Sequence, residues 1–149
     1  LLVNNAAKTD IKKNKLALKN YYDVFDTNFF GALNTSLNYL KQNQRGRKQI
    51  INISSIVVTK GSYNFPAYAS SKIAFDNASM SLSKIFKGVR LVSLILGKTN
   101  TAKFRSNHNI KSNEILSDTI APEQVANKIY QIFKNKKKYL SGTSVKLNK

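Results

Sequence analysis

The sequence predicts a three-layer α/β fold built on a parallel sheet. Short apolar runs alternate with longer segments whose apolar residues recur every three to four positions, the spacing of a helix face. The short runs are β-branched and apolar on both faces, as in parallel strands that are covered on both sides. The chain also opens on such a run, Leu1 to Val3, with no turn or helix before it. We therefore expect the sheet to be incomplete at its amino-terminal side.

The first half of the chain is expected to run strand, connection, helix, strand. Residues 1–3 form the first strand, and residues 8–19 form a lysine-rich connection. Residues 21–42 have a helical apolar face, made by Val24, Phe25, Phe29, Ala32, Leu33, Leu37 and Leu40. A polar turn with a glycine follows, and the β-branched run at 49–58 is predicted to be a buried strand.

The second half is expected to repeat this order. After a loop at 59–65, Pro66 suits the first turn of a helix, which continues to Phe86. Gly88 precedes another buried strand at 89–96. The order of elements predicts right-handed connections, and hence a Rossmann-type fold.

The carboxyl-terminal third is expected to hold one more helix and one more strand. Residues 98–117 are polar and are predicted to be an irregular flap. Residues 121–138 are predicted to form a helix, and a short strand through Tyr139 and Leu140 is expected to end the sheet. No linker or repeat divides the chain, so we expect residues 1–149 to form a single domain.

Composition excludes several classes of protein. The chain has no cysteine and one histidine, His108, so we expect neither disulfides nor a zinc site, and His108 is interpreted as a loop residue. No apolar run has the length of a membrane span, and no signal peptide is recognisable. A cytoplasmic protein is the simplest expectation.

The formal net charge of +18 raises the possibility of a nucleic-acid-binding or other polyanion-binding α/β protein. However, only Arg45, Arg47, Arg90 and Arg105 are arginines, and the lysines are spread along the chain. We interpret the excess of lysine as compositional, so nucleic-acid binding is the weaker hypothesis.

Polar side chains follow each predicted strand. Asn4 and Asn5, Ser54 and Ser55, and the segment 97–101 all lie where ligands bind in parallel α/β sheets, beyond the carboxyl ends of the strands. Tyr68 begins a helix near the same edge, and Lys72 lies one helical turn later on the same face. A nearby ammonium favours a phenolate, so this pair suits proton transfer to or from an alcohol or carbonyl oxygen. Ser55 could stabilise charge on that oxygen.

In order along the chain, the segments NNAA (4–7), DTNFFGAL (26–33), NISS (52–55), YASSK (68–72) and LGKTNT (96–101) resemble the motifs of short-chain dehydrogenases/reductases. The resemblance implies an NAD(P)-dependent oxidoreductase that interconverts an alcohol and a ketone or aldehyde. It implies Asn28, Ser55, Tyr68 and Lys72 as catalytic residues, with Tyr68 as general acid/base and Lys72 lowering its pKa. It implies cofactor contacts at Asn4, Ala6, Tyr68, Lys72, Gly97, Thr99 and Thr101.

The resemblance also implies a small-molecule substrate, selected by residues 98–120, and a homodimer or homotetramer packed through helices 21–42 and 66–86. Ser54 is interpreted as strand-end polarity, and Ser70 and Ser71 as helix-surface residues.

Three departures from the family pattern stand in this sequence. The six glycines are scattered, so no glycine-rich phosphate-binding turn exists in the 149 residues, and the choice between NAD and NADP is not predicted. Ala7 and Leu96 stand where the family usually has glycine and proline. A truncated, non-catalytic remnant of the family is therefore the alternative within the same fold.

Overall fold

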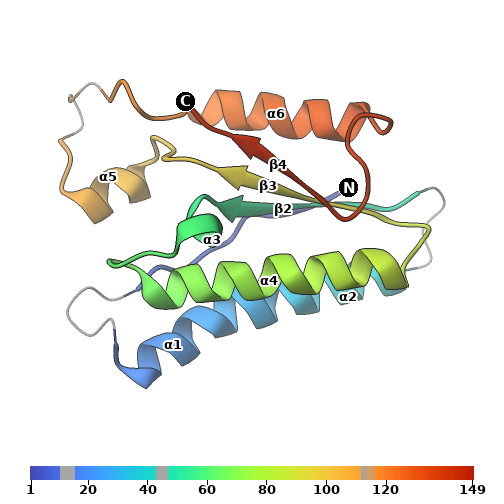
Figure 1. The fold of residues 1–149 in the computed structure, drawn as a ribbon, viewed down its shortest axis with the longest axis horizontal. Coiled ribbons are helices and arrows are strands. Elements are labelled where there is room, and N and C mark those ends of the chain that lie inside the picture. The colour runs from blue at the N-terminus through green and yellow to red at the C-terminus, as the bar shows by residue number, and fades with distance from the viewer. Residues whose placement is uncertain (11–15, 43–46, 112–113, 115) are drawn as a thin grey trace.

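A parallel sheet organises the structure (Figure 1). The computed structural model describes residues 1–10, 16–42, 47–111, 114 and 116–149. Within these residues four strands pair in the order β1-β2-β3-β4, and every pairing is parallel. The strands are β1 (Leu2–Asn4), β2 (Gln49–Ser55), β3 (Arg90–Leu96) and β4 (Thr143–Leu147). The sequence prediction of a parallel sheet is confirmed.

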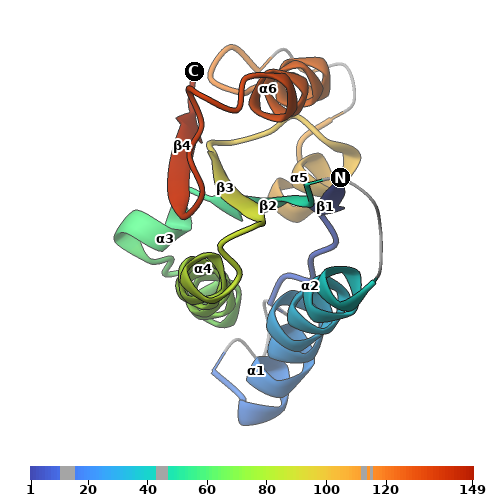
Figure 2. The same ribbon diagram turned by 90° about the vertical axis from the view of Figure 1, so that its right-hand side faces the viewer.

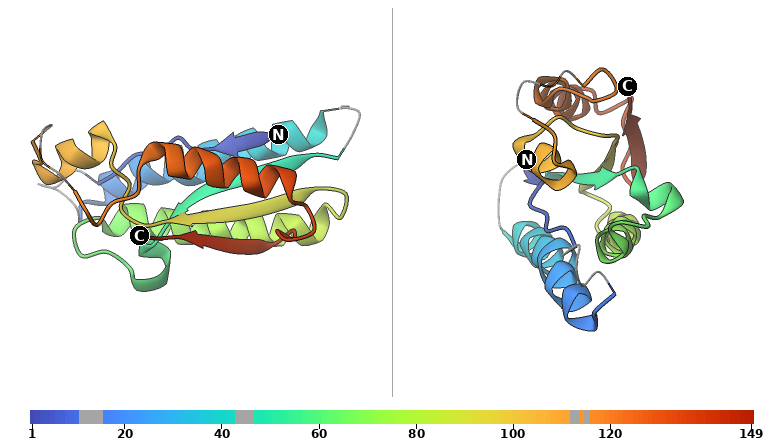
Figure 3. Two further views of the ribbon diagram at one scale, coloured as in Figure 1. Left: turned by 90° about the horizontal axis from the view of Figure 1, so that it is seen from above. Right: turned by 90° about the vertical axis from the view of Figure 1, so that its left-hand side faces the viewer.

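Helices cover both faces of the sheet, which gives the three predicted layers (Figure 2). One face carries α1 (Leu18–Phe25), the π-helix η2 (Asp26–Gly31), α2 (Ala32–Lys41) and α4 (Pro66–Ile85). The opposite face carries α6 (Pro122–Lys134), which lies across the strands in Figure 3. The short helices α3 (Val57–Lys60) and α5 (Ala102–His108) lie beyond the carboxyl ends of the strands. None of the helices in the described part of the chain is long and apolar enough to cross a bilayer.

Successive residues of the central strands face opposite layers, because side chains alternate along a strand. Ile51 and Val92 pack with Ile132 of α6, whereas their neighbours Ile50 and Leu91 pack beneath α2 and α4. Both faces of β2 and β3 are therefore buried, which explains why these strands are continuous apolar runs rather than alternating ones.

The second strand is shorter than predicted. Its pairing with β3 ends at the partners Ser55 and Leu96, where β3 gives way to Gly97. The backbone N–H of Ile56 still donates to the carbonyl of Leu96 (2.8 Å), but the next residues, Val57–Lys60, form α3. The β-branched run predicted a longer strand, which is wrong because no partner strand continues beyond Leu96.

The helix predicted at 21–42 begins earlier, at Leu18, and is divided by η2. Wide π-helical turns of this kind are rare and occur often at functional sites. The helix predicted at 121–138 ends at Lys134, so the basic cluster that follows it is a turn.

The region predicted to be an irregular flap contains α5. Thr101 caps this helix: its hydroxyl oxygen accepts the backbone N–H of Phe104 (3.1 Å). His108 is the last residue of α5 rather than a loop residue, and its ring lies 4.5 Å from that of Phe104. Part of the predicted flap (112, 113 and 115) lies outside the described residues, as do 11–15 of the predicted connection and 43–46 of the polar turn.

The last strand is Thr143–Leu147, so the strand predicted through Tyr139 and Leu140 is wrong. Tyr139 is buried in the core on the α6 side. Its aromatic side chain indicated a strand, but here it belongs to the turn after α6 and packs this turn against the core. The chain then turns through Gly142, whose φ of 77° is unstrained only for glycine, and enters β4.

Candidate active site

The predicted catalytic residues meet at the carboxyl edge of the sheet. Ser55 ends β2, and Tyr68 lies in the first turn of α4, directly after Pro66. The Ser55 hydroxyl lies near the Tyr68 phenol, where its hydrogen-bonding interaction favours the phenolate and acts to lower the pKa of Tyr68. The Lys72 Nζ lies 5.8 Å from the centre of the Tyr68 ring. The face of α4 that carries Tyr68 and Lys72 therefore points toward the end of β2 rather than into solvent.

The phenol of Tyr68 is held in its neutral form. Burial of the side chain raises the pKa of Tyr68, the hydrogen bond with Ser55 opposes this rise, and the negative charge of Asp76 adds to it. The spacing of Tyr68 and Lys72 predicted a lowered pKa for the phenol, whereas in this structure the pKa is raised, because burial has the largest effect. A neutral phenol is a proton donor.

Lys72 is a buried ammonium with a relative exposure of 5%. Its Nζ donates to the carbonyl oxygen of Ile53 in β2 (2.8 Å). Burial lowers the pKa of Lys72 to about 8; Asp76 opposes this shift, and Lys103 contributes to it. Lys72 is therefore charged at neutral pH but close to the point at which it would lose its proton.

Asn28 lies in η2 and is almost completely buried, with 1% exposure. Its side-chain amide accepts the backbone N–H of Lys8 (2.7 Å) and donates to the Lys8 carbonyl (2.9 Å) and to the Ser71 hydroxyl (2.9 Å). Ser71 in turn donates to the carbonyl of Tyr68 (2.8 Å). Asn28 thus joins the loop after β1 to the turn that carries Tyr68.

Ser71 itself is completely buried, so its prediction as a helix-surface residue is wrong, whereas Ser70 is exposed. Ser71 lies on the face of α4 that packs against η2. Because Ser70 and Ser71 are adjacent serines, the sequence did not show which of them lies on the buried face and which on the outer face.

Asn4 joins β1 to its neighbours. Its amide nitrogen donates to the Ser36 hydroxyl of α2 (2.9 Å) and to the side-chain oxygen of Asn52 in β2 (2.7 Å). Asn52 continues the chain by donating to Ser79 of α4 (2.7 Å). Buried polar groups of this kind rigidify a fold when each has a partner. Asn4 therefore holds the strand end beside the candidate site, and a direct contact with a cofactor remains a prediction.

The remaining predicted cofactor residues lie along the same edge, but their side chains do not converge. Ala6 is exposed after β1. A side chain at Gly97 would meet Asn148, with only 3.3 Å from its Cβ to Oδ1, so this glycine accommodates the segment after β4. The Thr99 hydroxyl donates to the Gly97 carbonyl, and Thr101 caps α5. Their roles toward a cofactor remain predictions.

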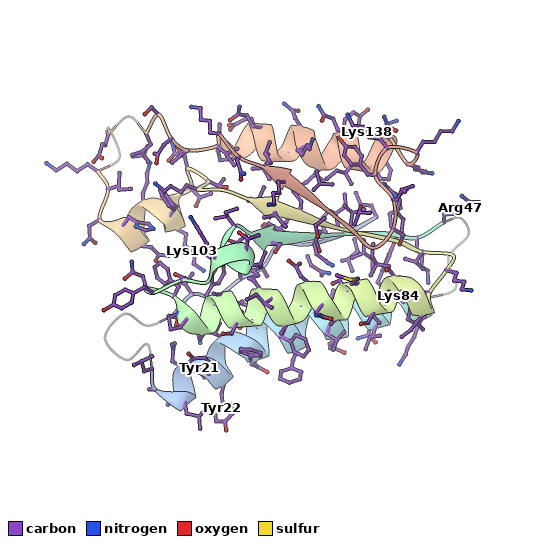
Figure 4. All side chains as sticks on the ribbon, viewed as in Figure 1. Tyr21, Tyr22, Arg47, Lys84, Lys103 and Lys138 are labelled. Atoms are coloured by element: carbon purple, nitrogen blue, oxygen red, sulfur yellow. The ribbon has the colours of Figure 1, made fainter. Side chains whose placement is uncertain are left out.

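The side chain of Lys103 reaches from α5 to the loop after β1. Figure 4 shows it between α5 and the helices below the sheet, and its Nζ donates to the carbonyl of Ala7 (2.5 Å). This cation is one cause of the lowered pKa of Lys72. Nothing in the sequence distinguishes Lys103, because it is one lysine among many in a basic chain.

Two acidic residues near the site were also missed. The carboxylate of Asp10 accepts the backbone N–H groups of Ala67 (2.9 Å) and Tyr68 (2.8 Å). Asp76 accepts the hydroxyls of Ser54 (2.6 Å) and Ser93 (2.9 Å), so the reading of Ser54 as simple strand-end polarity was incomplete. For Asp76 the sequence does contain a signal, because it lies four residues after Lys72 on the same helical face.

No group of three or more histidine, cysteine, aspartate or glutamate side chains is placed to bind a metal ion within the part of the chain that the structure describes. The polar groups that the structure places together at this edge are the phenol of Tyr68, the ammonium of Lys72 and the hydroxyl of Ser55.

These features define an α/β protein with a tyrosine, a lysine and a serine at the carboxyl edge of its parallel sheet. A sequence profile of the family described as "short chain dehydrogenase" matches residues 1–111. The chain belongs to this family.

Individual relatives agree with the assignment. A fatty acyl-CoA reductase of Acinetobacter baylyi is 32% identical over 144 residues, a match that covers 92% of this chain and 48% of that protein. Among solved structures, a protein titled short chain dehydrogenase/reductase family protein has a TM-score of 0.82 at 23% identity and covers 98% of this chain. An actinorhodin polyketide ketoreductase variant with NADPH has a TM-score of 0.82 at 20% identity and covers 99% of this chain.

A 4-hydroxyisoleucine dehydrogenase complexed with NADH and succinate has a TM-score of 0.74 at 19% identity and covers 98% of this chain. The chain spans 64% to 65% of the lengths of these three structures and about half the length of the curated relative. At these low identities the structures support the fold alone.

Proposed function

We propose that the chain supplies the catalytic part of an NAD(P)-dependent oxidoreductase that interconverts an alcohol and a ketone or aldehyde, with Tyr68 as general acid/base. The observation that carries the proposal is the convergence of Tyr68, Lys72 and Ser55 at the end of β2. The family assignment supports it, as do the names of the relatives, which include a reductase, a dehydrogenase and a ketoreductase with NADH or NADPH bound.

In the direction of reduction, Tyr68 acts as the acid. The reduced nicotinamide, when bound, supplies a hydride to the carbonyl carbon. The electron pair of the C=O π bond moves onto oxygen, and the Tyr68 Oη–H bond breaks to give that oxygen its proton. Ser55 donates a hydrogen bond to the same oxygen and stabilises the developing negative charge. Oxidation of the alcohol is the reverse and requires Tyr68 as phenolate.

The residues at the edge fit the nicotinamide end of a dinucleotide. An ammonium has three donors, and among the described residues Lys72 uses one of them, toward Ile53. Lys72 therefore has donors left for the hydroxyls of a ribose. Asn4, Ala6, Gly97, Thr99 and Thr101 lie along the same edge and would line the rest of this end. Neither the glycine-rich turn that holds the pyrophosphate nor the acidic or basic residue that separates NAD from NADP binding is recognisable among the 149 residues.

Substrate selection is assigned to the segment 98–120, which includes α5. Phe104 and His108 of α5 form a ring cluster with Phe65, which directly precedes α4. Together they would give the substrate side of the edge an apolar wall. We propose a small-molecule substrate with an apolar group beside its carbonyl, in keeping with the name of the acyl-CoA reductase relative.

Family likeness also suggests a homodimer or homotetramer. The outer faces of α1 and η2 carry large apolar side chains that are more than half exposed, at Tyr22 (67%) and Phe30 (57%). On α4, Ile73 and Met80 are 44% and 46% exposed and line the cavity between α4, β3 and β4. We propose that these faces pack against a second copy of the chain.

Replacement of Tyr68 by phenylalanine tests the catalytic proposal. The native gene product carrying Tyr68→Phe should lose turnover by at least about a hundredfold, the usual contribution of a positioned acid or base. Its affinity for NADH or NADPH, measured by fluorescence, should change little. Tyr63→Phe is the matched control, because Tyr63 is 86% exposed. Turnover at the wild-type rate in Tyr68→Phe would contradict the assignment, and a native protein without turnover would favour the non-catalytic remnant.

A further inference from the structure

Asp76 lies on the same face of α4 as the proposed catalytic pair. Tyr68, Lys72 and Asp76 are spaced four residues apart, so their side chains follow one another along the helix. Asp76 is one of only seven acidic residues in a chain of net charge +18. An acidic side chain at this position is therefore not explained by the basic composition of the chain.

The carboxylate of Asp76 is anchored by two strands. Oδ2 accepts the hydroxyl of Ser54 in β2 (2.6 Å), and Oδ1 accepts the hydroxyl of Ser93 in β3 (2.9 Å). Both serines are buried. Each oxygen of the Asp76 side chain therefore has one serine hydroxyl as its partner.

Lys72 and Asp76 contact consecutive residues of β2. Lys72 donates to the carbonyl of Ile53, and Asp76 accepts from the hydroxyl of Ser54. The two charges are therefore held on the same side of one strand end. Among the described residues, the Lys72 ammonium and the Asp76 side chain do not form a salt bridge. Their electrostatic attraction therefore acts over a longer distance, where the low dielectric constant of the protein interior strengthens it.

Few other charges face Asp76. It lines a cavity of about 210 Å³ between α4, β3 and β4, and every other residue of the lining is uncharged, including Ser79 of α4, Ser93 of β3 and Ser144 of β4. On α4 the ionisable neighbours are Tyr68 and Lys72, and on α5 Lys103 faces Lys72. Lys60, the last residue of α3, and Lys146 of β4 are exposed to solvent.

A buried ammonium is costly unless a negative charge compensates it. We propose that Asp76 is a positioning residue for proton transfer, acting as the counter-charge that keeps Lys72 protonated beside Tyr68. This inference rests on the proposed function for its catalytic meaning, but the pairing of charges can be measured without turnover. Lys103 works against Asp76 because it places a second cation beside Lys72.

The test is a titration of Lys72 in the native gene product, followed by NMR with ¹³Cε-labelled lysine and assigned through the signal lost in Lys72→Met. In Asp76→Asn, which keeps the shape of the side chain and one of its two acceptor oxygens, the pKa of Lys72 should fall from about 8 by roughly one unit. An unchanged titration overturns the proposal.

Two controls separate charge from packing. Ser93→Ala removes one hydrogen bond to Asp76 but keeps its charge, and Asp26→Asn removes an exposed carboxylate from η2. Both should leave the titration of Lys72 in place, and a shift in Ser93→Ala as large as that in Asp76→Asn would overturn the proposal. If Asp76→Asn yields too little folded protein, adding Lys72→Met should restore cooperative unfolding, and failure to do so would also overturn it.

The outcomes distinguish this inference from the proposed function. If Lys72 shifts in Asp76→Asn but the native protein reduces no carbonyl substrate with NADH or NADPH, the charge pairing stands and the enzymatic proposal fails. If turnover is present but the titration does not move, the enzymatic proposal stands and the role of Asp76 fails.

Discussion

The carboxylate of Asp10 accepts the backbone N–H of Tyr68, with 2.8 Å between Oδ2 and the nitrogen. The other oxygen accepts the N–H of Ala67 (2.9 Å) and the side-chain amide of Asn20 (3.2 Å). A residue 57 to 58 positions away thus caps the helix that carries the proposed acid/base and joins it to α1. Helix capping of this kind satisfies the free N–H groups of the first turn.

Removal of this cap should destabilise the fold and displace Tyr68. Asp10→Ala leaves two backbone N–H groups without an acceptor at a buried position, and we expect a loss of about 1–3 kcal/mol in the free energy of unfolding. Urea denaturation of the native protein measures the loss. Asp10→Asn, which keeps one acceptor, should lose less, and Asp26→Ala on the exposed face of η2 should change little. Equal stability of Asp10→Ala and wild type would contradict the cap.

The direction of the reaction should depend on pH. Because the pKa of Tyr68 is raised, the phenol is protonated at neutral pH and serves as the acid for carbonyl reduction. Alcohol oxidation requires the phenolate, so its kcat/KM should rise with pH by up to about tenfold per unit. Steady-state kinetics in both directions across neutral to alkaline pH check this. Oxidation that slows as the pH rises toward 8 would contradict the role of Tyr68.

Stability should also depend on pH through Lys72. Its pKa falls from 10.5 in the unfolded chain to about 8 in the folded protein, so between these values the unfolded state binds more protons and unfolding becomes less favourable as the pH rises. The free energy of unfolding of wild type relative to Lys72→Met should be flat below pH 8. It should then increase by up to ~3 kcal/mol toward pH 10.5.

The comparison with Lys72→Met matters because every other ionisable group is present in both proteins, so that its contribution cancels in the difference. Lys84→Met is the control, since Lys84 is an exposed residue of the same helix. A pH-independent difference between wild type and Lys72→Met would show that Lys72 does not titrate in this window.

The proposed association of two copies through α1, η2 and α4 can be tested at Phe30. A charge at this 57% exposed position should weaken a packed apolar interface, so Phe30→Glu should shift the native protein toward monomer in sedimentation velocity. Tyr63→Glu is the control, because Tyr63 lies in the loop before α4. A native protein that is monomeric at all concentrations, or an assembly that Phe30→Glu leaves intact, would exclude this interface.

Much of the fold could be predicted from the order and spacing of residues. The continuous β-branched apolar runs at β2 and β3 predict strands covered on both sides, and Pro66 marks the start of α4. Prediction failed where a local pattern suits two structures: VVTK after Ser55 is as good a strand as a helical turn, and a short polar helix such as α5 has little apolar periodicity.

For the candidate site, too, one part could be predicted from the sequence and another part could not. The sequence by itself determined that Tyr68 and Lys72 share a helical face and that Ser55 lies in a strand, because helix and strand periodicities are local properties. That this strand ends at Ser55 was decided by its pairing with β3. Only the tertiary structure decided the contacts of Asp10 with the start of α4, of Asn28 with Lys8, and of Asp76 with Ser54 and Ser93.

The tertiary structure also decided the protonation of Tyr68. Spacing alone favoured a lowered pKa through the nearby ammonium, whereas the folded protein raises it. The physical reason is that desolvation depends on how completely the surrounding elements exclude water, and on which distant charges they bring near, and neither quantity is a property of a residue and its neighbours in sequence.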